Sequence, residues 1–148
     1  MQIISPIYCS IAIAVFALSS TVRAQNVDLC AIARSPSQFC GKMITIRATT
    51  WHSVDGGGLE SGQCRTVLSL QAPEKSKVPV PFKLRRDESW QTFTHYDAMS
   101  SELSGYPSPQ PNYLVTATFR GLFACRRELT PWYFLVLESV SDVKVEPN

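Results

Sequence analysis

The sequence has few histidines and lacks the short motifs that mark common catalytic and metal sites. It contains only two histidines, His52 and His95, and they form no His-x-x-x-His pair. No Cys-x-x-Cys pair, Gly-x-Ser-x-Gly segment or lysine-bearing phosphate loop occurs. These absences argue against a zinc site, a common type of serine hydrolase and a P-loop nucleotidase. We therefore expect no metal, no cofactor and no enzymatic activity.

The sequence also lacks a large excess of either charge. Its 14 Lys and Arg residues and 12 Asp and Glu residues give a formal net charge of +2. Such a balance argues against wholesale electrostatic binding to nucleic acid or to an anionic membrane surface. Two local basic pairs, Arg85-Arg86 and Arg126-Arg127, are exceptions, and surface charges of this kind are usually solvated.

No uninterrupted apolar run is long enough to cross a membrane, which takes about 20 residues. The run Ile11–Leu18 is instead typical of a signal-peptide core, and Val22-Arg23-Ala24 has small or β-branched residues at positions −3 and −1 of a cleavage site. We predict a signal peptide over residues 1–24 and one domain over residues 25–148, periplasmic or secreted. Because no Lys or Arg precedes the apolar core, an uncleaved anchor is the alternative.

Removal of residues 1–24 takes Cys9 away and leaves an even set of cysteines: Cys30, Cys40, Cys64 and Cys125. An even set in an exported chain predicts disulfides, because the compartment is oxidising. A zinc site is the weaker alternative, since the spacings do not suit one.

Hydrophobic periodicity predicts a mainly β domain with two helices. Asp28 is expected to cap a short helix over Leu29–Arg34, and apolar residues three or four apart predict a second helix over about Glu88–Ser104. Strands are expected at the following ranges: Lys42–His52, Thr66–Gln71, Val78–Leu84, Tyr113–Phe123 and Trp132–Val145. Asp55–Gly58 is expected to be a turn, and the two prolines of the third strand confine it to a sheet edge or a bulge.

This order of elements is that of a five-stranded OB-like Greek-key barrel with a helix between its third and fourth strands. An α+β sandwich of the same elements is the alternative. The segments Ser37–Arg47, Ala117–Phe123 and Leu135–Val140 resemble strand patterns of small exported bacterial OB-fold-like proteins. That resemblance implies the barrel and leaves the activity open, because many of these proteins are uncharacterised.

Under the barrel arrangement, Cys64 and Cys125 are expected at loops flanking one face, which favours a Cys64–Cys125 bridge and, by elimination, Cys30–Cys40. The same face is the candidate binding site. Its candidate residues are aromatic, histidine and arginine side chains at predicted strand ends: Trp51, His52, Arg65, Arg126, Arg127 and Trp132. The opposing interpretation is that the two tryptophans complete the core.

We expect an exported, non-enzymatic OB-like binding or interaction module of the cell envelope. Its partner would be an envelope or secreted protein or a small ligand, with nucleic acid disfavoured by the charge balance. Two alternatives remain open. One is an OB-fold that binds single-stranded nucleic acid or oligosaccharide, and the other is a small secreted hydrolase that uses His52 or His95.

Overall fold

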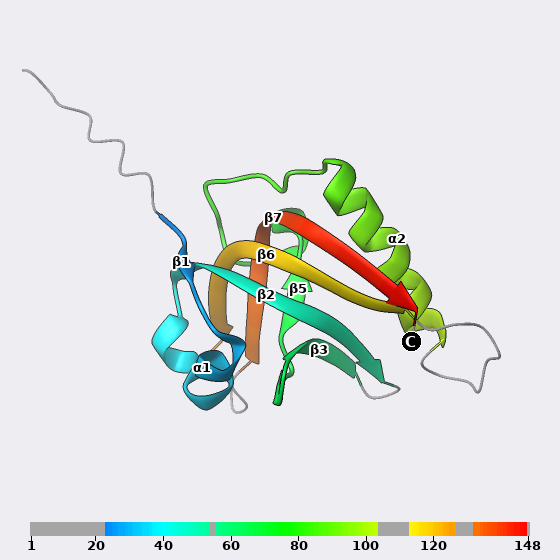
Figure 1. Ribbon diagram of the computed structural model, residues 1–148. Coiled ribbons are helices and arrows are strands. Elements are labelled where there is room, and N and C mark those ends of the chain that lie inside the picture. Colours follow the sequence, from blue (N-terminus) through cyan, green and yellow to red (C-terminus); the bar gives the residue numbers. More distant parts are fainter. Residues whose placement is uncertain (1–22, 54–55, 104–112, 127–131, 148) are drawn as a thin grey trace, which may run out of the picture.

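The computed structural model describes residues 23–53, 56–103, 113–126 and 132–147, and it is mainly β (Figure 1). The predicted signal peptide therefore lies almost wholly outside the described residues. Within the described ranges, no helix has both the length and the apolar character needed to span a membrane. The elements follow in this order: β1 (Gln25–Asn26), α1 (Leu29–Arg34), η1 (Pro36–Phe39), β2 (Lys42–Ser53), β3 (Gly56–Ser61), β4 (Cys64–Thr66), β5 (Ser69–Gln71), η2 (Pro73–Lys75), α2 (Glu88–Leu103), β6 (Tyr113–Arg126) and β7 (Trp132–Pro147).

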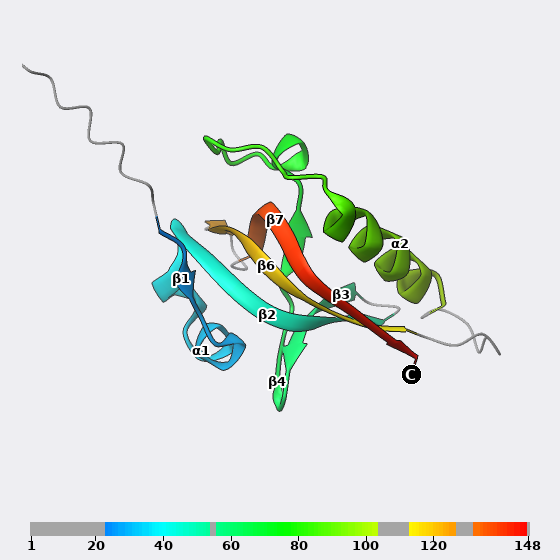
Figure 2. The same ribbon diagram turned by 45° about the horizontal axis from the view of Figure 1, so that its top comes forward.

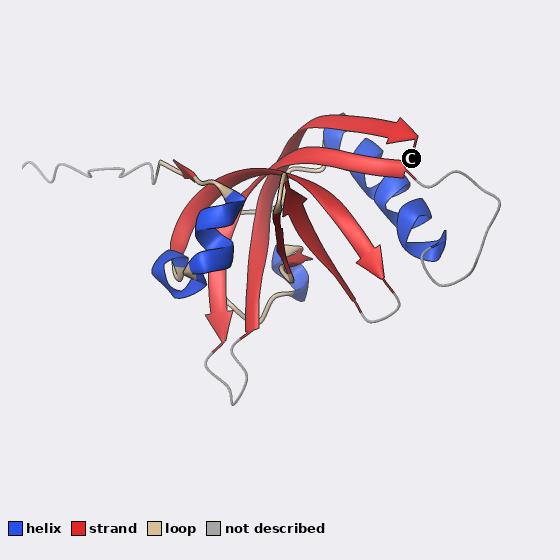
Figure 3. Cartoon of the chain, turned by 60° about the horizontal axis from the view of Figure 1, so that its bottom comes forward, coloured by secondary structure: helices blue, strands red, loops and turns tan. Residues whose placement is uncertain are grey.

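Both predicted helices are confirmed, together with the predicted cap of the first. The Asp28 carboxylate accepts a hydrogen bond from the backbone N–H of Cys30 at 3.1 Å and so caps α1. Asp87 does the same for the N–H of Trp90 at 3.2 Å, at the start of α2. The two helices lie at opposite ends of the sheet (Figure 3).

Strands β2, β6 and β7 confirm the three longest predicted strands, whereas the middle of the chain differs from the prediction. The segment Gly56–Gly58 is the start of β3 and not a turn. Gly58 permits this close pairing, because a Cβ there would lie 3.0 Å from the carbonyl carbon of Thr66. The segment Val78–Leu84 is not a strand, since Pro79 and Pro81 have no N–H to donate to a ladder.

The sheet has the strand order β4-β3-β2-β6-β7-β5, and β1 pairs with β2. Its two end strands belong to one stretch of chain, because only Val67 and Leu68 separate β4 from β5. β4 pairs antiparallel with β3, and β5 pairs parallel with β7. Within the part of the chain that the structure describes, no continuous ladder of hydrogen bonds closes this sheet, so the predicted five-stranded barrel is not confirmed.

The core lies inside the curved sheet and is covered at its ends by the helices. Alternate residues of β2 and β6 point into it, with Ile44, Ile46 and Phe119 fully buried. Leu29 and Ile32 enter from α1, and Phe93 enters from α2, where its ring meets Phe119 edge to face at 5.3 Å. Trp90 and Tyr96 of α2 pack against the same core, as their spacing predicted.

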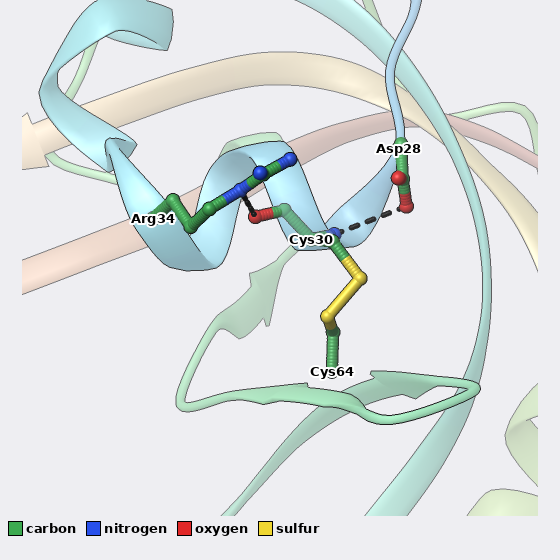
Figure 4. Close-up of a disulfide and its surroundings, with 4 residues drawn as sticks. All are labelled: Asp28, Cys30, Arg34 and Cys64. Carbon is green, nitrogen blue, oxygen red and sulfur yellow. Dashed lines mark hydrogen bonds between the residues drawn. A yellow bond between two sulfur atoms is a disulfide. The ribbon is translucent and has the colours of Figure 1, made fainter.

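The disulfides are Cys30–Cys64 and Cys40–Cys125, so the predicted pairs Cys30–Cys40 and Cys64–Cys125 are wrong. The error follows from the glycine segment. Because β3 begins at Gly56, Cys64 lies after the β3–β4 turn, beside α1, and not on a β2–β3 loop. Figure 4 shows Cys30 on α1 reaching Cys64, with the carbonyl of Cys30 accepting a hydrogen bond from Arg34. The four cysteines that follow residue 24 are therefore all bridged, and none of these four is a free thiolate for zinc.

The Cys40–Cys125 bridge follows from the register of β2 against β6. Lys42 pairs with Phe123, and Gly41 donates a backbone hydrogen bond to the Phe123 carbonyl at 2.8 Å. Continuing this antiparallel register by two residues brings Cys40 opposite Cys125, with Cα atoms 5.5 Å apart. The bridge therefore pins the end of β6, next to Arg126, to the start of β2.

Candidate functional site

The six predicted site residues do not form one site. Trp51 and His52 lie near the carboxyl end of β2. Arg126, the last residue of β6, pairs with Trp132, the first residue of β7. Because β2 and β6 are antiparallel, these places are at opposite ends of the sheet. Residues 42 to 51 of β2 separate them, which is roughly 30 Å of extended chain at about 3.3 Å per residue. Arg127 lies outside the described residues.

At the first place, Trp51 and Arg65 are engaged with each other. The Arg65 guanidinium lies over the Trp51 ring, 4.8 Å from its centroid, and donates two hydrogen bonds to Glu60 at 2.9 and 2.6 Å. The indole nitrogen of Trp51 is buried. The ring face and the fork of donors are thus occupied within the protein, and we interpret this cluster as a brace between β2, β3 and β4.

His52 joins the sheet to α2. Its Nε2 lies 2.9 Å from Oδ1 of Asp97, and both side chains are about three-quarters buried. The other ring nitrogen, Nδ1, faces β3 so closely that a Cβ placed on Gly57 would lie 3.2 Å from it. Two members of a catalytic triad are therefore present, but the position where a nucleophile would approach the imidazole is next to strand backbone.

We expect His52→Ala to lower the free energy of unfolding by about 1 kcal/mol, because it removes a partly buried side-chain hydrogen bond between two elements. His95→Ala is the matched control, since His95 is exposed on the same helix that carries Asp97. The free energy of unfolding of that variant should differ from that of the parent protein by less than about 0.5 kcal/mol. Urea denaturation of both variants measures the difference, and equal losses would contradict a bracing role for His52.

The second place contains a hollow of about 350 Å³ at the end of the β6–β7 pair. Two short flanking segments also contribute to it: β5 through Gln71, and η2 with the residues after it through Lys75 and Lys77. The strands supply Arg126, Trp132 and Phe134. Trp132 is 61% exposed, so it does not complete the core as the opposing interpretation had it. An exposed tryptophan beside three cations is an arrangement that suits a ligand with a flat or ring-shaped face and a negative charge.

The carboxylate nearest in sequence to the lysines of this hollow, Glu74, interacts with Arg86 and with the charge of the adjacent Lys75. Glu74 forms an ion pair with Arg86. Its pKa is lowered, first by a hydrogen bond to backbone and also by the positive charge of Arg86, so Glu74 stays ionised and engaged there. Among the described residues, neither Lys75 nor Lys77 has an ion-pair partner, and both are exposed. The two lysines therefore contribute positive charge to the hollow.

Sequence analysis placed Arg126 and Trp132 in this site but missed Gln71, Lys75, Lys77 and Phe134. One signal was available in the sequence, the alternation of Lys75 and Lys77 with smaller residues in a proline-rich segment. Their place in the hollow depends on the parallel pairing of β5 with β7, which sets Ser69 opposite Phe134 and Gln71 opposite Val136 and so brings the chain after β5 to this face of β7. No local pattern shows that pairing.

No protein-family model, no characterised protein and no solved structure matches this chain. The candidate site is therefore interpreted from its own geometry and charge.

Proposed function

We propose that the protein is an exported, non-enzymatic OB-like module that binds an anionic, ring-containing ligand in the hollow of Lys75, Lys77, Arg126 and Trp132. The observation that carries the proposal is the exposed Trp132 ring beside three cationic side chains in one hollow. Ring stacking fixes the orientation of such a ligand, and charged donors select its anionic group.

The strand order supports the OB-like part of the proposal. We take β2 and β3 as the first two strands, the interrupted segment Cys64–Gln71 as the third, and β6 and β7 as the last two. The third strand then pairs with the second through β4 and with the fifth through β5, and α2 lies between the third and fourth strands. This is the arrangement that OB-folds use, whose strand faces and loops bind ligands.

Two observations support export. The described chain carries two disulfides, which persist in oxidising compartments and are rare in the cytosol. The amino-terminal sequence independently has the composition of a signal peptide. Non-enzymatic binding is favoured over hydrolysis because the His52–Asp97 pair lies against the backbone of Gly57.

Titration of intrinsic tryptophan fluorescence with a sugar carboxylate tests the proposal. We expect glucuronate to bind and to change the fluorescence, while glucose, which has the same ring without the carboxylate, binds at least about tenfold more weakly. Trp132→Ala should abolish the fluorescence response. Arg126→Gln should weaken glucuronate binding by about tenfold, the usual value of one charge-assisted hydrogen bond.

Arg65→Gln is the matched control, because it removes an arginine that also lies beside a tryptophan but at the far end of the sheet. It should leave glucuronate affinity unchanged. If Arg65→Gln weakened binding as much as Arg126→Gln, the ligand would lie at the Trp51 end of β2. If neither glucuronate nor glucose 6-phosphate bound at millimolar concentration, the proposed site would be wrong.

A further inference from the structure

The side chains that line the hollow at Trp132 offer many hydrogen-bond donors and few acceptors. An ammonium group, a guanidinium and an indole N–H all donate, and none of these three groups accepts. The hollow has two ammonium groups, one guanidinium and one indole, from Lys75, Lys77, Arg126 and Trp132. No carboxylate is among the described residues that line it. A ligand that suits this lining should therefore bring several acceptors and few donors.

Gln71 supplies the one side-chain acceptor among the described lining residues, since its amide oxygen accepts while its NH₂ group donates. The preceding residue, Leu70, packs against the main core, so the Gln71 side chain points to the opposite face of the sheet. Phe134 and Val136 lie in the apolar cluster on that face. Within the described ranges the Gln71 amide has no hydrogen-bond partner, so its oxygen and its NH₂ group are both open to a ligand.

The two lysines reach the hollow from the chain that follows β5. The backbone N–H of Lys75 donates to the carbonyl of Ala72 at 3.0 Å and so forms the turn that carries this lysine. Val78, directly after Lys77, packs against the apolar cluster that contains Phe134. Figure 2 shows the chain after β5 beside the start of β7, on the side away from α1. The segment that carries both lysines is therefore held at its two ends.

Three cations without a carboxylate suit a group that carries more than one negative charge. A phosphate monoester has a charge of about −1.5 to −2 at pH 7 and three terminal oxygens that accept hydrogen bonds. A carboxylate has one charge and two oxygens, which match the guanidinium fork of Arg126 and leave the charges of Lys75 and Lys77 uncompensated. The cations of the hollow therefore favour a phosphate over a carboxylate.

The donor-rich lining also favours an aromatic ring over a sugar ring. Each sugar hydroxyl carries a donor, and a donor that leaves water and faces only other donors loses its hydrogen bond. An aromatic ring adds no donor of this kind and stacks on a tryptophan face, which is worth about 1–3 kcal/mol for a nucleic-acid base. Trp132 is exposed and so can be stacked on by a ligand.

We propose that the ligand of this hollow is a small aromatic phosphate monoester, with its ring on Trp132 and its phosphate among Lys75, Lys77 and Arg126. Gln71 offers its amide to a polar atom on the ring. Nucleoside monophosphates belong to this chemical class. The inference rests on the proposed function and adds to it the chemical class of the ring and of the anionic group. The hollow of about 350 Å³ is within the usual range for small-molecule sites.

Calorimetric titration of the full-length oxidised protein with four probes tests the ring and the anionic group separately. Phenyl phosphate has the aromatic ring and the phosphate. Benzoate keeps the aromatic ring but has a carboxylate, glucose 6-phosphate keeps the phosphate on a sugar ring, and glucuronate has neither feature. Phenyl phosphate should bind at least about tenfold more tightly than benzoate or glucose 6-phosphate, and glucuronate should bind most weakly.

Three variants test the residues. Lys75→Gln and Lys77→Gln should each weaken phenyl phosphate binding by about three- to tenfold and benzoate binding by less than about twofold. Gln71→Glu places a carboxylate in the hollow and should weaken phenyl phosphate binding by at least about tenfold. Lys83→Gln is the matched control, because Lys83 is a lysine of the same loop that lines other hollows. It should change each affinity by less than about twofold.

Equal affinities for glucuronate and phenyl phosphate, both removed by Trp132→Ala, would overturn this inference and leave the proposed function intact. Tighter binding of benzoate than of phenyl phosphate would overturn the phosphate, and tighter binding of glucose 6-phosphate would overturn the aromatic ring. An effect of Lys83→Gln as large as that of Lys75→Gln would show that total charge, and not the hollow, selects the ligand. Absence of binding by all four probes at millimolar concentration would overturn both the proposed function and its extension.

Discussion

Replacing Cys40 and Cys125 together with alanine is expected to lower the free energy of unfolding by about 4.6 kcal/mol. The bridge closes a loop with a sequence separation of 85 residues, and the entropy of the unfolded chain rises when such a loop is opened. Because Cys125 precedes Arg126, the same double variant should also lose glucuronate affinity, as the end of β6 is no longer pinned to β2. Guanidinium denaturation measures the first effect and fluorescence titration the second.

The other disulfide supplies the control for this experiment. Removing Cys30 and Cys64 together should cost about 3.8 kcal/mol, since its sequence separation is 34 residues. That bridge ties α1 to the β3–β4 turn, away from the hollow, so glucuronate affinity in the folded variant should not change. Equal losses of affinity in the two double variants would contradict a local role for Cys40–Cys125. Peptide mapping that recovered Cys64 joined to Cys125 would contradict the strand register itself.

Gly121→Ala is expected to lower the free energy of unfolding by at least about 3 kcal/mol. Gly121 lies beside an irregularity in the β6–β7 ladder, where the register shifts between Arg120 and Gly121. A Cβ there would overlap the carbonyl group of Val136, lying 2.9 Å from its carbon atom. The backbone of a paired strand cannot move away as a flexible side chain can, so β6 and β7 would have to separate at this position. A fall of about 10 °C or more in melting temperature is the expected measurement.

Gly62→Asn is the matched control for this substitution. Gly62 has a φ of 58° in the β3–β4 turn, and no heavy atom lies within 4 Å of the position that a Cβ would take. Asparagine tolerates the left-handed region better than most residues, so the free energy of unfolding of this variant should fall by less than about 1 kcal/mol. If Gly121→Ala melted as close to the parent protein as Gly62→Asn does, β6 and β7 would not approach each other as closely as described.

The elements with strong local patterns could be predicted well. The alternation of β-branched and polar residues in Lys42–Ser53 sets which of them are buried, and Ile44, Ile46 and Ala48 are buried as expected. The capping carboxylate of Asp28 and the apolar spacing of α2 likewise depend only on nearby residues. The errors in the predicted secondary structure lie in segments that contain several glycines or prolines. A run such as Gly56–Gly58 suits a turn locally, yet it forms a strand because Thr66 approaches it from another part of the chain.

The sequence by itself determined a mainly β chain with two helices, an even set of cysteines after residue 24, and the arginine and tryptophan of the hollow. These properties follow from periodicity, composition and type of residue. Only the tertiary structure decided which cysteines pair, that Trp51 and Trp132 lie at opposite ends of the sheet, and that Lys75 and Lys77 join Arg126. The physical reason is that these relations depend on strand register and on the β5–β7 pairing, which arise from contacts between residues far apart in the chain.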